Sequence, residues 1–441
     1  MKQSKHNIYY SPKEVRTILE RSIDTALDGL KGYCNDPVSD FTRCRKLPAR
    51  TLIECIMSFS NYSSIGEMSH FFEGHGKMPS ASALSQRRQL LDPDIFKRIN
   101  NLFVSAFDDH TTINGYHILA QDGSDVNIPF MDDKTKTEKH DAKSFCQYHV
   151  NALYDCLNKV FYDWSIDAAS KKREVNALIS ILKDRNYPKN SIFTADRGYE
   201  SYNLMAHFIE NDIKFVIRVK DIHTKSGLMT NIKTEEGAFD MRVNRTLTSL
   251  QTKEIKANKE KYIFVPTNSN FDFLDENRDF YDLSFRAVRF KISEDVYETV
   301  VTNLSEEEFK AEDFKELYHY RWNEETAFNK LKYTIGLVYF HARKRKLIQQ
   351  EINAAFLMYN VSEVVIRNID LKKNKKPELE YDYKPNFSSA VTNIRLYLRK
   401  QINMKELILR IKKFLVAQRP ERSFERNMKS QSCKSLNYRT S

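Results

Sequence analysis

The spacing of apolar residues divides the chain into regions of different secondary structure. Between residues 11 and 110, apolar residues recur every three to four positions, as Val15, Ile18 and Leu19 illustrate. This period is that of an amphipathic helix with one buried face. We therefore predict an all-α N-terminal domain over residues 1–112.

From residue 113 the period changes to short apolar runs that are bounded by polar residues. Such runs are typical of buried strands, and three strands followed by helix, strand, helix and strand predict an α/β fold with a mixed sheet. We assign residues 113–220 to this core. In chain order the elements are strands 116–120, 148–156 and 160–168, helix 175–182, strand 192–195, helix 202–209 and strand 215–219.

Strands continue beyond this core and then give way to long helices. Alternating apolar and polar residues predict a β-rich insertion over residues 221–304, and helical periodicity returns over residues 305–370. Residues 371–441 are predicted to form a basic helical C-terminal region. The individual elements are strands 262–265, 285–290 and 299–301, helices 312–332 and 346–367, a charged linker 372–384 and a helical stretch 394–416.

Composition is that of a globular protein. Of the 441 residues 41% are apolar, and Gly and Pro are sparse at 11 each, which argues against disorder. The six cysteines contain no C-x-x-C pair, so neither a zinc ribbon nor a disulfide framework is predicted. No apolar run approaches the roughly 18 residues of a membrane span, so we expect a soluble cytoplasmic protein with reduced thiols.

Positive charge is concentrated at the C-terminal end. Lys and Arg exceed Asp and Glu by 70 − 59 = +11. Residues 371–441 contain 18 basic and 6 acidic residues, a difference of 18 − 6 = +12, so the remainder is close to neutral. A basic tail on a neutral body predicts contact with nucleic acid; the alternative is a solvated tail that aids solubility.

A short basic helix is predicted within the N-terminal domain. The serine-containing segment 79–82 resembles a helix cap, and the helix after it carries Arg87 and Arg88. If both arginines are exposed, they can contact DNA phosphates. The alternative is a packing element with solvated arginines.

Two aspartates follow short apolar strands of the core. Asp122 comes after strand 116–120 and Asp196 after strand 192–195, and α/β folds place ligands and reactive groups at strand ends. Glycine follows in both motifs, at Gly123 and Gly198, which leaves room for a phosphate or a metal ion. Each motif by itself is also compatible with an ordinary turn.

The helix predicted over residues 312–332 gathers four polar side chains on one face. At about 100° per residue, Tyr318, Arg321, Glu325 and Lys332 lie within about 60° of one another. This face borders the apolar seam of the helix instead of opposing it. The alternative is a solvated helix in which Arg321 and Glu325 form an ordinary i,i+4 pair.

Together these residues resemble the DDE transposases of bacterial insertion sequences, in the IS-four-like branch that carries the Y-(2)-R-(3)-E-(6)-K signature. The four residues of the helix face match the signature at every position. The resemblance extends from about residue 47 to residue 434, with motifs in the order of the family. These motifs are Asp122-Gly123, Asp196-Arg197-Gly198-Tyr199, Phe340-His341-Ala342-Arg343 and Arg419-Pro420-Glu421-Arg422-Ser423.

The resemblance implies an RNase H-like core that is interrupted by the β-rich insertion, with Asp122, Asp196 and Glu325 as the catalytic, metal-binding acids. The separations of 196 − 122 = 74 and 325 − 196 = 129 residues suit a core with an inserted domain. Asp125 is a second candidate for the first acid, but Asp122 is the one in the Asp-Gly motif. The cofactor implied is Mg²⁺ or Mn²⁺, as two ions, because hard cations prefer carboxylate ligands.

The same resemblance implies the partners and the reaction. Tyr318, Arg321 and Lys332 are expected to contact phosphates of double-stranded DNA, both at the terminal inverted repeats of the element and in the target. The chain would cleave the ends and transfer them to the target as a homodimer, associated with the bacterial nucleoid when bound. The alternatives are an RNase H-like nuclease without strand transfer and a domesticated DNA-binding protein with an idle centre.

Overall fold

The computed structural model describes residues 1–5, 9–43, 46–73, 78–129, 136–137, 145–169, 174–222, 224, 226–266, 269, 271–294, 296–371 and 381–418. The predicted motif over residues 419–423 lies outside these residues, as do Cys44 and Cys433. Helices, one large mixed sheet and two small two-stranded sheets make up the described part, so the α/β class is confirmed. None of the described helices is both long and apolar enough to cross a membrane.

The centre of the sheet has the strand pattern predicted for the core. Three strands pair antiparallel, and two further strands run parallel to the first of them, which gives the order β6-β5-β3-β7-β8. β7 is buried at all five positions, as expected for a parallel strand covered on both faces. The strands are β3 (His117–Ile128), β5 (Phe145–Asp155), β6 (Val160–Ala168), β7 (Ser191–Ala195) and β8 (Lys214–Val219).

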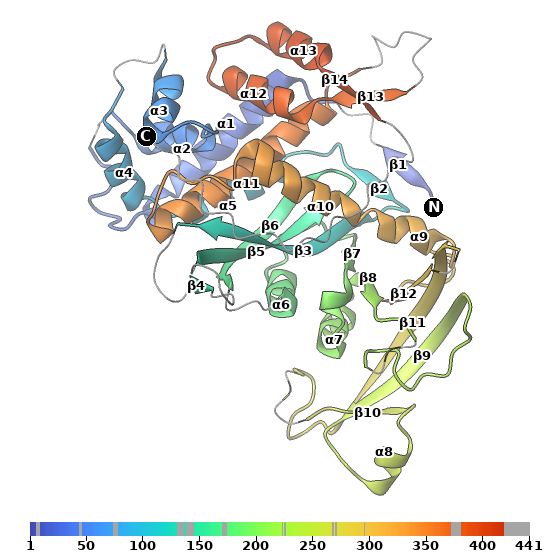
Figure 1. Cartoon of the computed structure of the whole chain (residues 1–441). Helices are drawn as coiled ribbons and strands as arrows, with labels where there is room; N and C mark the ends of the chain where they lie inside the picture. The colour runs from blue at the N-terminus through green and yellow to red at the C-terminus, as the bar shows by residue number, and fades with distance from the viewer. Residues whose placement is uncertain are drawn as a thin grey trace.

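The segment predicted as a β-rich insertion continues this sheet. β12 pairs antiparallel with β8, and β11 pairs with both β12 and β9. The β9 and β11 pair extends well beyond the rest of the molecule, with a short helix near its tip (Figure 1). These elements are β9 (Phe239–Thr248), α8 (Lys253–Ala257), β10 (Tyr262–Phe264), β11 (Phe280–Ser293) and β12 (Val296–Thr302).

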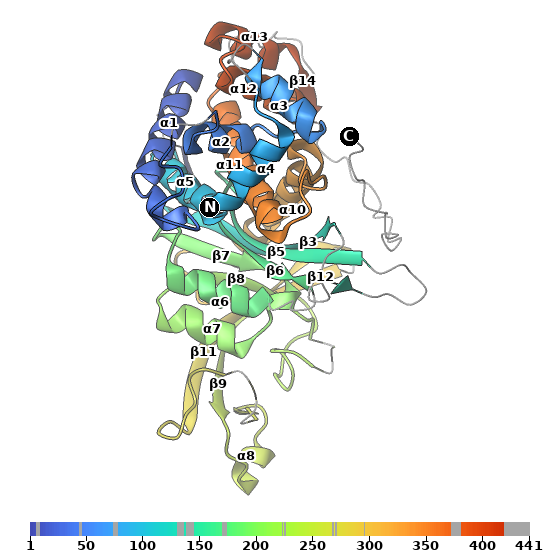
Figure 2. The same cartoon turned by 90° about the vertical axis from the view of Figure 1, so that its left-hand side faces the viewer.

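Helices cover both faces of the central strands. α6 (Glu174–Asp184) and α7 (Tyr202–Glu210) lie on one face, whereas α10 (Trp322–Asn329) and α11 (Arg345–Arg367) lie on the other (Figures 1 and 2). α11 is buried along most of its length, because it lies between the sheet and the N-terminal helices. The core of the molecule is therefore built around this helix.

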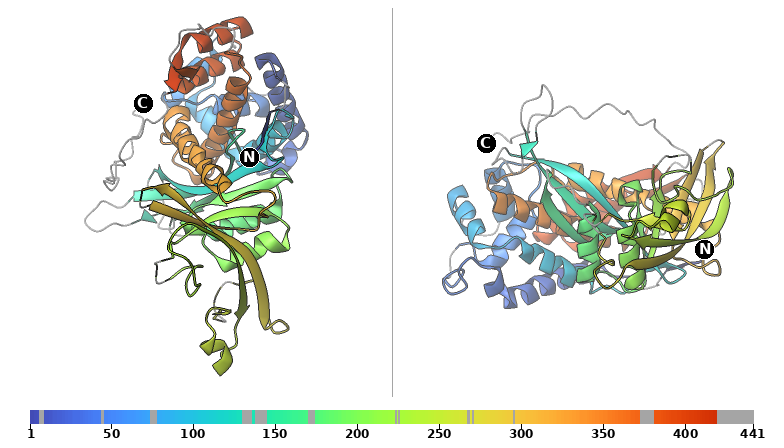
Figure 3. Two further views of the ribbon diagram at one scale, coloured as in Figure 1. Left: turned by 90° about the vertical axis from the view of Figure 1, so that its right-hand side faces the viewer. Right: turned by 90° about the horizontal axis from the view of Figure 1, so that it is seen from below.

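The N-terminal region is helical, as predicted. α1 begins with a capping box, in which the Glu14 N–H donates to the Ser11 hydroxyl and the Ser11 N–H donates to the Glu14 carboxylate at 2.7 Å. The N-terminal helices gather with α11 at the end of the molecule opposite to the β9–β11 pair (Figure 3). They are α1 (Pro12–Asp28), α2 (Ala49–Met57), α3 (Ser64–Phe72), α4 (Ala81–Leu90) and α5 (Asp94–Val104).

Three predicted elements differ in the structure. β3 does not end before Asp122 but runs on to Ile128, because β5 pairs with it as far as the Ile128–Cys146 pair. The single helix predicted over residues 312–332 is divided into α9 (Asp313–His319), α10 and the π-helical turn η5 (Lys330–Ile335). Backbone angles at Tyr320 and Arg321 stay helical, so the chain keeps its direction between α9 and α10.

The helical stretch predicted over residues 394–416 is also wrong as one element. α12 ends at Leu398, Lys400 takes a left-handed φ of 61°, and Asn403 caps the next helix. A two-stranded antiparallel sheet pairs the end of the predicted linker with residues 415–418 at the end of this stretch. The elements are β13 (Asp382–Pro385), α12 (Phe387–Leu398), α13 (Met404–Lys413) and β14 (Leu415–Gln418).

Candidate active site

Asp122 and Asp196 lie where the parallel pairing of β3 and β7 ends. The last paired residues are Gln121 and Ala195, so each aspartate is the next residue on its strand. Neighbouring strands are about 4.8 Å apart, which makes the two aspartates neighbours at the edge of this pairing. Asp196 also caps the 3₁₀ turn η4 (Arg197–Tyr199), where its Oδ1 accepts the Gly198 N–H at 2.7 Å.

The guanidinium of Arg321 links Asp122 to the third predicted acid. Its Nη1 lies 3.7 Å from Asp122 Oδ2, and its Nη2 lies 3.3 Å from Glu325 Oε1. Arg321 is only 4% exposed, so this contact is not the solvated i,i+4 pair of the alternative interpretation. α10 therefore brings Glu325 to the end of the β3–β7 pairing.

The other two residues of the predicted helix face also contact this region. Tyr318 is buried, and its ring lies beneath the Arg321 guanidinium at 5.6 Å. Lys332 on η5 donates from Nζ to the backbone oxygen of Asp125 at 2.8 Å. Burial lowers the pKa of Lys332, which is nevertheless partly exposed. The helix face predicted from residue spacing is therefore directed at β3.

Negative charge accumulates around Asp122. Burial raises the pKa of its carboxyl to about 6, and the charges of Asp196 and Glu325 add to this effect. The Gly123 N–H and Arg321 act in the opposite direction. A carboxyl group that resists ionisation among other acids favours a cation nearby.

The donor chemistry of the three acids fits a hard divalent cation, because all potential ligands are carboxylate oxygens. Within the described residues, no three His, Cys, Asp or Glu side chains are already grouped so that they could hold a metal ion. Arg321 instead contacts two of the three acids. These two contacts neutralise part of the negative charge of Asp122 and Glu325, which a bound cation would otherwise neutralise.

His149 is a site residue that the sequence did not reveal. It lies on β5, is 2% exposed, and contacts Asp125 Oδ1 through Nδ1 at 2.8 Å and Glu174 Oε1 through Nε2 at 3.1 Å. Burial alone would lower its pKa, but the two carboxylates raise it to about 9. Asp125, the second candidate for the first acid, therefore forms an ion pair with His149.

The His149 ring explains why a glycine follows Asp122. A Cβ atom at Gly123 would lie 2.3 Å from His149 Nε2 and 3.0 Å from Glu174 Oε1, which no side chain can tolerate without displacing the ring. Similarly, a Cβ atom at Gly198 would lie 3.0 Å from Asp196 Oδ1 and 3.4 Å from Glu174 Oε2. Both glycines thus allow side chains to pack closely beside the two aspartates.

Glu324 and Glu325 are adjacent in sequence but differ in environment. Glu325 is partly exposed next to Arg321, whereas Glu324 is fully buried. Burial raises the pKa of Glu324 well above its ordinary value, and the charge of Asp122 adds to the effect. Of the two carboxyl groups, only that of Glu325 is therefore accessible from solvent.

The prediction that Arg87 and Arg88 are exposed is wrong. Arg87 is 9% exposed, donates to the backbone oxygen of Leu47 and lies over the ring of Phe41. Arg88 is 3% exposed and forms an ion pair with Glu351 of α11 at 2.8 Å. Both side chains pack inside the N-terminal region and are not available to DNA phosphates.

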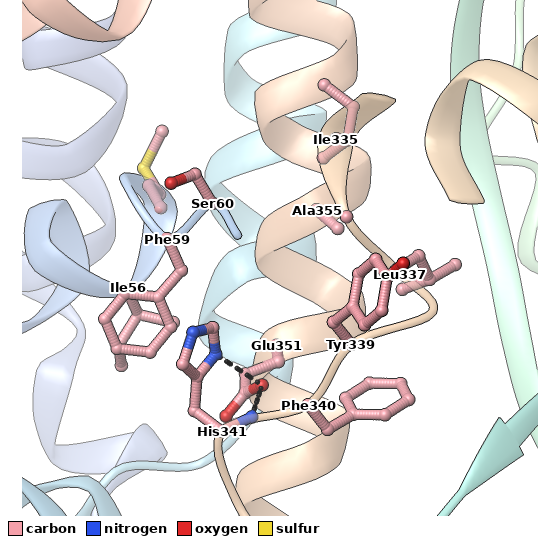
Figure 4. A pocket seen from close by; sticks show the side chains of 12 residues that line it. Ile56, Phe59, Ser60, Ile335, Leu337, Tyr339, Phe340, His341, Glu351 and Ala355 are labelled. Carbon is pink, nitrogen blue, oxygen red and sulfur yellow. Dashed lines mark hydrogen bonds and ion pairs between the residues drawn. The ribbon is translucent and has the colours of Figure 1, made fainter. Parts of the chain in front are cut away.

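Arg88 belongs to a buried chain of alternating charges. Glu351 also accepts from His341, through the backbone N–H at 2.8 Å and the ring Nδ1 at 3.2 Å, as Figure 4 shows. His341 Nε2 lies 3.5 Å from Glu67 of α3, which is fully buried. The predicted motif over residues 340–343 thus connects the N-terminal helices to α11.

Residues 113–361, more than half of the chain, match the family model described as a transposase DDE domain. No curated protein matches the chain. Among solved structures, the chain is similar to the piggyBac transposase in the cryo-EM structure of its synaptic complex with hairpin DNA, at 12% identity, over 96% of this chain and 90% of that chain, with a TM-score of 0.45.

Proposed function

The chain belongs to the transposase DDE domain family, and from this premise we propose that it cuts the ends of its element and joins them to target DNA at Asp122, Asp196 and Glu325. Membership of the family makes it an enzyme of DNA transposition. The assignment of the three acids is our own.

One observation carries this assignment: acids from three separate elements converge. Asp122 and Asp196 follow the last residues of the β3–β7 pairing, and Arg321 connects Asp122 to Glu325 on α10. Burial raises the pKa of Asp122, and the charges of the other two acids add to this effect. Such a concentration of carboxylates has no stabilising role of its own, because like charges repel.

Enzymes of this family generally use divalent metal ions. We propose that the three carboxylates hold two Mg²⁺ or Mn²⁺ ions, which would stabilise the entering and leaving oxygens of an in-line displacement at phosphorus. For the carboxylates to serve as ligands, Arg321 must give up one of its two contacts. Water is the nucleophile in cleavage, and the 3′-hydroxyl that cleavage releases is the nucleophile in strand transfer.

The remaining residues of the signature divide into two roles. Tyr318 and Arg321 are buried, which supports a role in holding the acids in place. Lys332 is partly exposed, and its ammonium can neutralise a phosphate but cannot coordinate a cation. We therefore propose Lys332 as the contact to a phosphate near the cut.

Double-stranded DNA is the proposed partner, as terminal inverted repeats and as target, with two copies of the chain bridging the two ends. The proposed core is RNase H-like, formed by residues 113–220 and 305–370, with residues 221–304 inserted. The pairing of β12 with β8 supports this division. The chain leaves the central strands after β8 and returns beside β8 in β12.

A cleavage and joining assay tests the proposal. The full chain is incubated with Mg²⁺ or Mn²⁺ and duplexes that carry the ends of its element, together with a target plasmid. Cut ends and joined products are the expected result. Cutting without joining would identify a hydrolytic nuclease instead, and intact ends in both metals would overturn the proposal.

A further inference from the structure

A pocket lined by several basic side chains lies away from the three acids. It occupies about 340 Å³ between the β5–β6 turn, the end of α10, the end of α11 and the two-stranded sheet of β13 and β14. Four basic side chains line it together with one acid, Glu363. The basic residues are Lys159, Lys330, Arg367 and Lys384.

Two of these cations are already neutralised and two are not. Lys330 pairs with Glu363 at 2.6 Å, and Arg367 pairs with Asp109 at 2.5 Å. Across the part of the chain that the structure describes, Lys159 and Lys384 form no ion pair. The pocket therefore carries uncompensated positive charge.

The lysines converge on one another from three separate segments. Burial lowers the pKa of Lys384, and the charges of Lys330 and Lys159 lower it further. Lys159 holds a left-handed φ of 58°, a conformation that Gly or Asn adopts more easily than Lys. Lysines without an ion pair that are gathered among like charges favour a bound anion.

The adjoining chain cannot supply this anion. β14 ends at Gln418, which lines the pocket, and residues 419–441 contain 6 basic and 2 acidic residues, a difference of 6 − 2 = +4. The anion must therefore come from a partner. A polyanion that offers several phosphates fits two such lysines better than a single small anion does.

The pocket lies behind the helix that carries Glu325. Lys330 is five residues further along, which is about 7.5 Å along a helix axis and about 140° around it. With a helix diameter of about 10 Å, the Glu325 and Lys330 side chains start roughly 12 Å apart, which is the length of about four base pairs of duplex. A duplex cut at the acids is therefore long enough to reach the pocket.

We propose that the pocket lined by Lys159, Lys330 and Lys384 binds backbone phosphates of the DNA a few base pairs from the cut. This inference rests on the proposed function, since it assumes that DNA lies at the three acids. The group that binds is a phosphate, and we propose that it belongs to the nucleic acid backbone and not to a free small anion.

The test measures the affinity of the full chain for a duplex of element ends between 50 and 500 mM KCl. Each neutralised phosphate contributes about 0.9 to the slope of log K against log[salt], so K159Q/K384Q should lower the slope by about 1.8. If the two proteins bind equally at 1 M salt, this difference becomes a loss of about sixtyfold at 0.1 M. K159R/K384R should restore the wild-type slope.

K13Q/K31Q is the matched control, because Lys13 and Lys31 are exposed and lie on α1 and η1 (Leu30–Tyr33), outside the pocket. An equal slope for K159Q/K384Q and wild type would overturn the inference, as would an equal loss in K13Q/K31Q. Lys159 and Lys384 can also be acetylated chemically in the presence of a protecting ligand. If inorganic phosphate protected both lysines and the duplex did not, the inference would likewise be overturned. Failure of the proposed function can be told apart from failure of this inference, because the wild-type protein itself would then leave the ends uncut.

Discussion

Replacing Arg88 by alanine should destabilise the protein strongly. The guanidinium donates to Glu351 Oε1 at 2.8 Å, to the Leu347 backbone oxygen at 2.7 Å and to Gln350 Oε1 at 3.2 Å, and it is 3% exposed. Removing one partner of a buried ion pair costs about 3–5 kcal/mol, because the other charge remains buried. His341 still contacts Glu351, so we expect a cost near 3 kcal/mol, or a loss of more than a hundredfold in the folding equilibrium.

Urea unfolding of the full chain, followed by circular dichroism, measures this effect. R98A is the control, because Arg98 is exposed on the neighbouring α5 and its removal should change the free energy of unfolding by no more than about 0.5 kcal/mol. In R88A/E351Q no buried charge is left without its partner, so part of the loss should be recovered. The contrary result would be that R88A keeps the wild-type free energy of unfolding while its DNA binding depends less on salt than that of wild type. Arg88 would then be an exposed DNA contact, and its assignment to the interior would be wrong.

Two further predictions concern the buried histidines. Arg88 and His341 outweigh burial and lower the pKa of Glu351 to about 2, whereas Glu351 and Glu67 raise that of His341 to about 9. The free energy of unfolding should therefore fall below about pH 4.5 as Glu351 is protonated, and above about pH 6.5 as His341 loses its proton. In H341Q, the free energy of unfolding measured with urea should fall less above about pH 6.5 than in wild type. A pH profile equal to that of wild type would contradict the ion pair between His341 and Glu351. G123A should push the His149 ring away from its carboxylates, so NMR titration should show the pKa of His149 falling from about 9 and cleavage should weaken; an unchanged titration would contradict the packing at Gly123.

Spacing along the sequence predicted the strand ends and the helix face that lie near Asp122, but not the contacts between them. Short apolar strands before Asp122 and Asp196 are local features, and their pairing follows from the α/β pattern. The helical period likewise predicted that Arg321, Glu325 and Lys332 share a face. These relations depend on residues that lie within one or two turns of each other or at equivalent strand ends.

Contacts between distant segments could not be predicted in this way. Arg88 looked like an exposed basic residue because its partner Glu351 is 263 residues further along the chain. β3 extends past Asp122 because β5 pairs with it, although Gly123 disfavours a strand. His149 acquires its role only when β5 brings it beside Asp125 and Glu174. By contrast, the end of α12 had a local signal, since Asn403 is a favourable helix cap.

The central claim is tested most directly by comparing E325Q with E324Q in metal-dependent cleavage. The two residues are adjacent and chemically alike, but only Glu325 is partly exposed and forms an ion pair with Arg321, which also contacts Asp122. E325Q loses a metal ligand and should cut the ends at least about a hundredfold more slowly while binding them normally. E324Q replaces a carboxyl that is buried away from solvent and whose pKa is raised by burial, so it removes no accessible metal ligand and should cut at close to the wild-type rate. Cleavage retained in E325Q and abolished in E324Q would contradict the account.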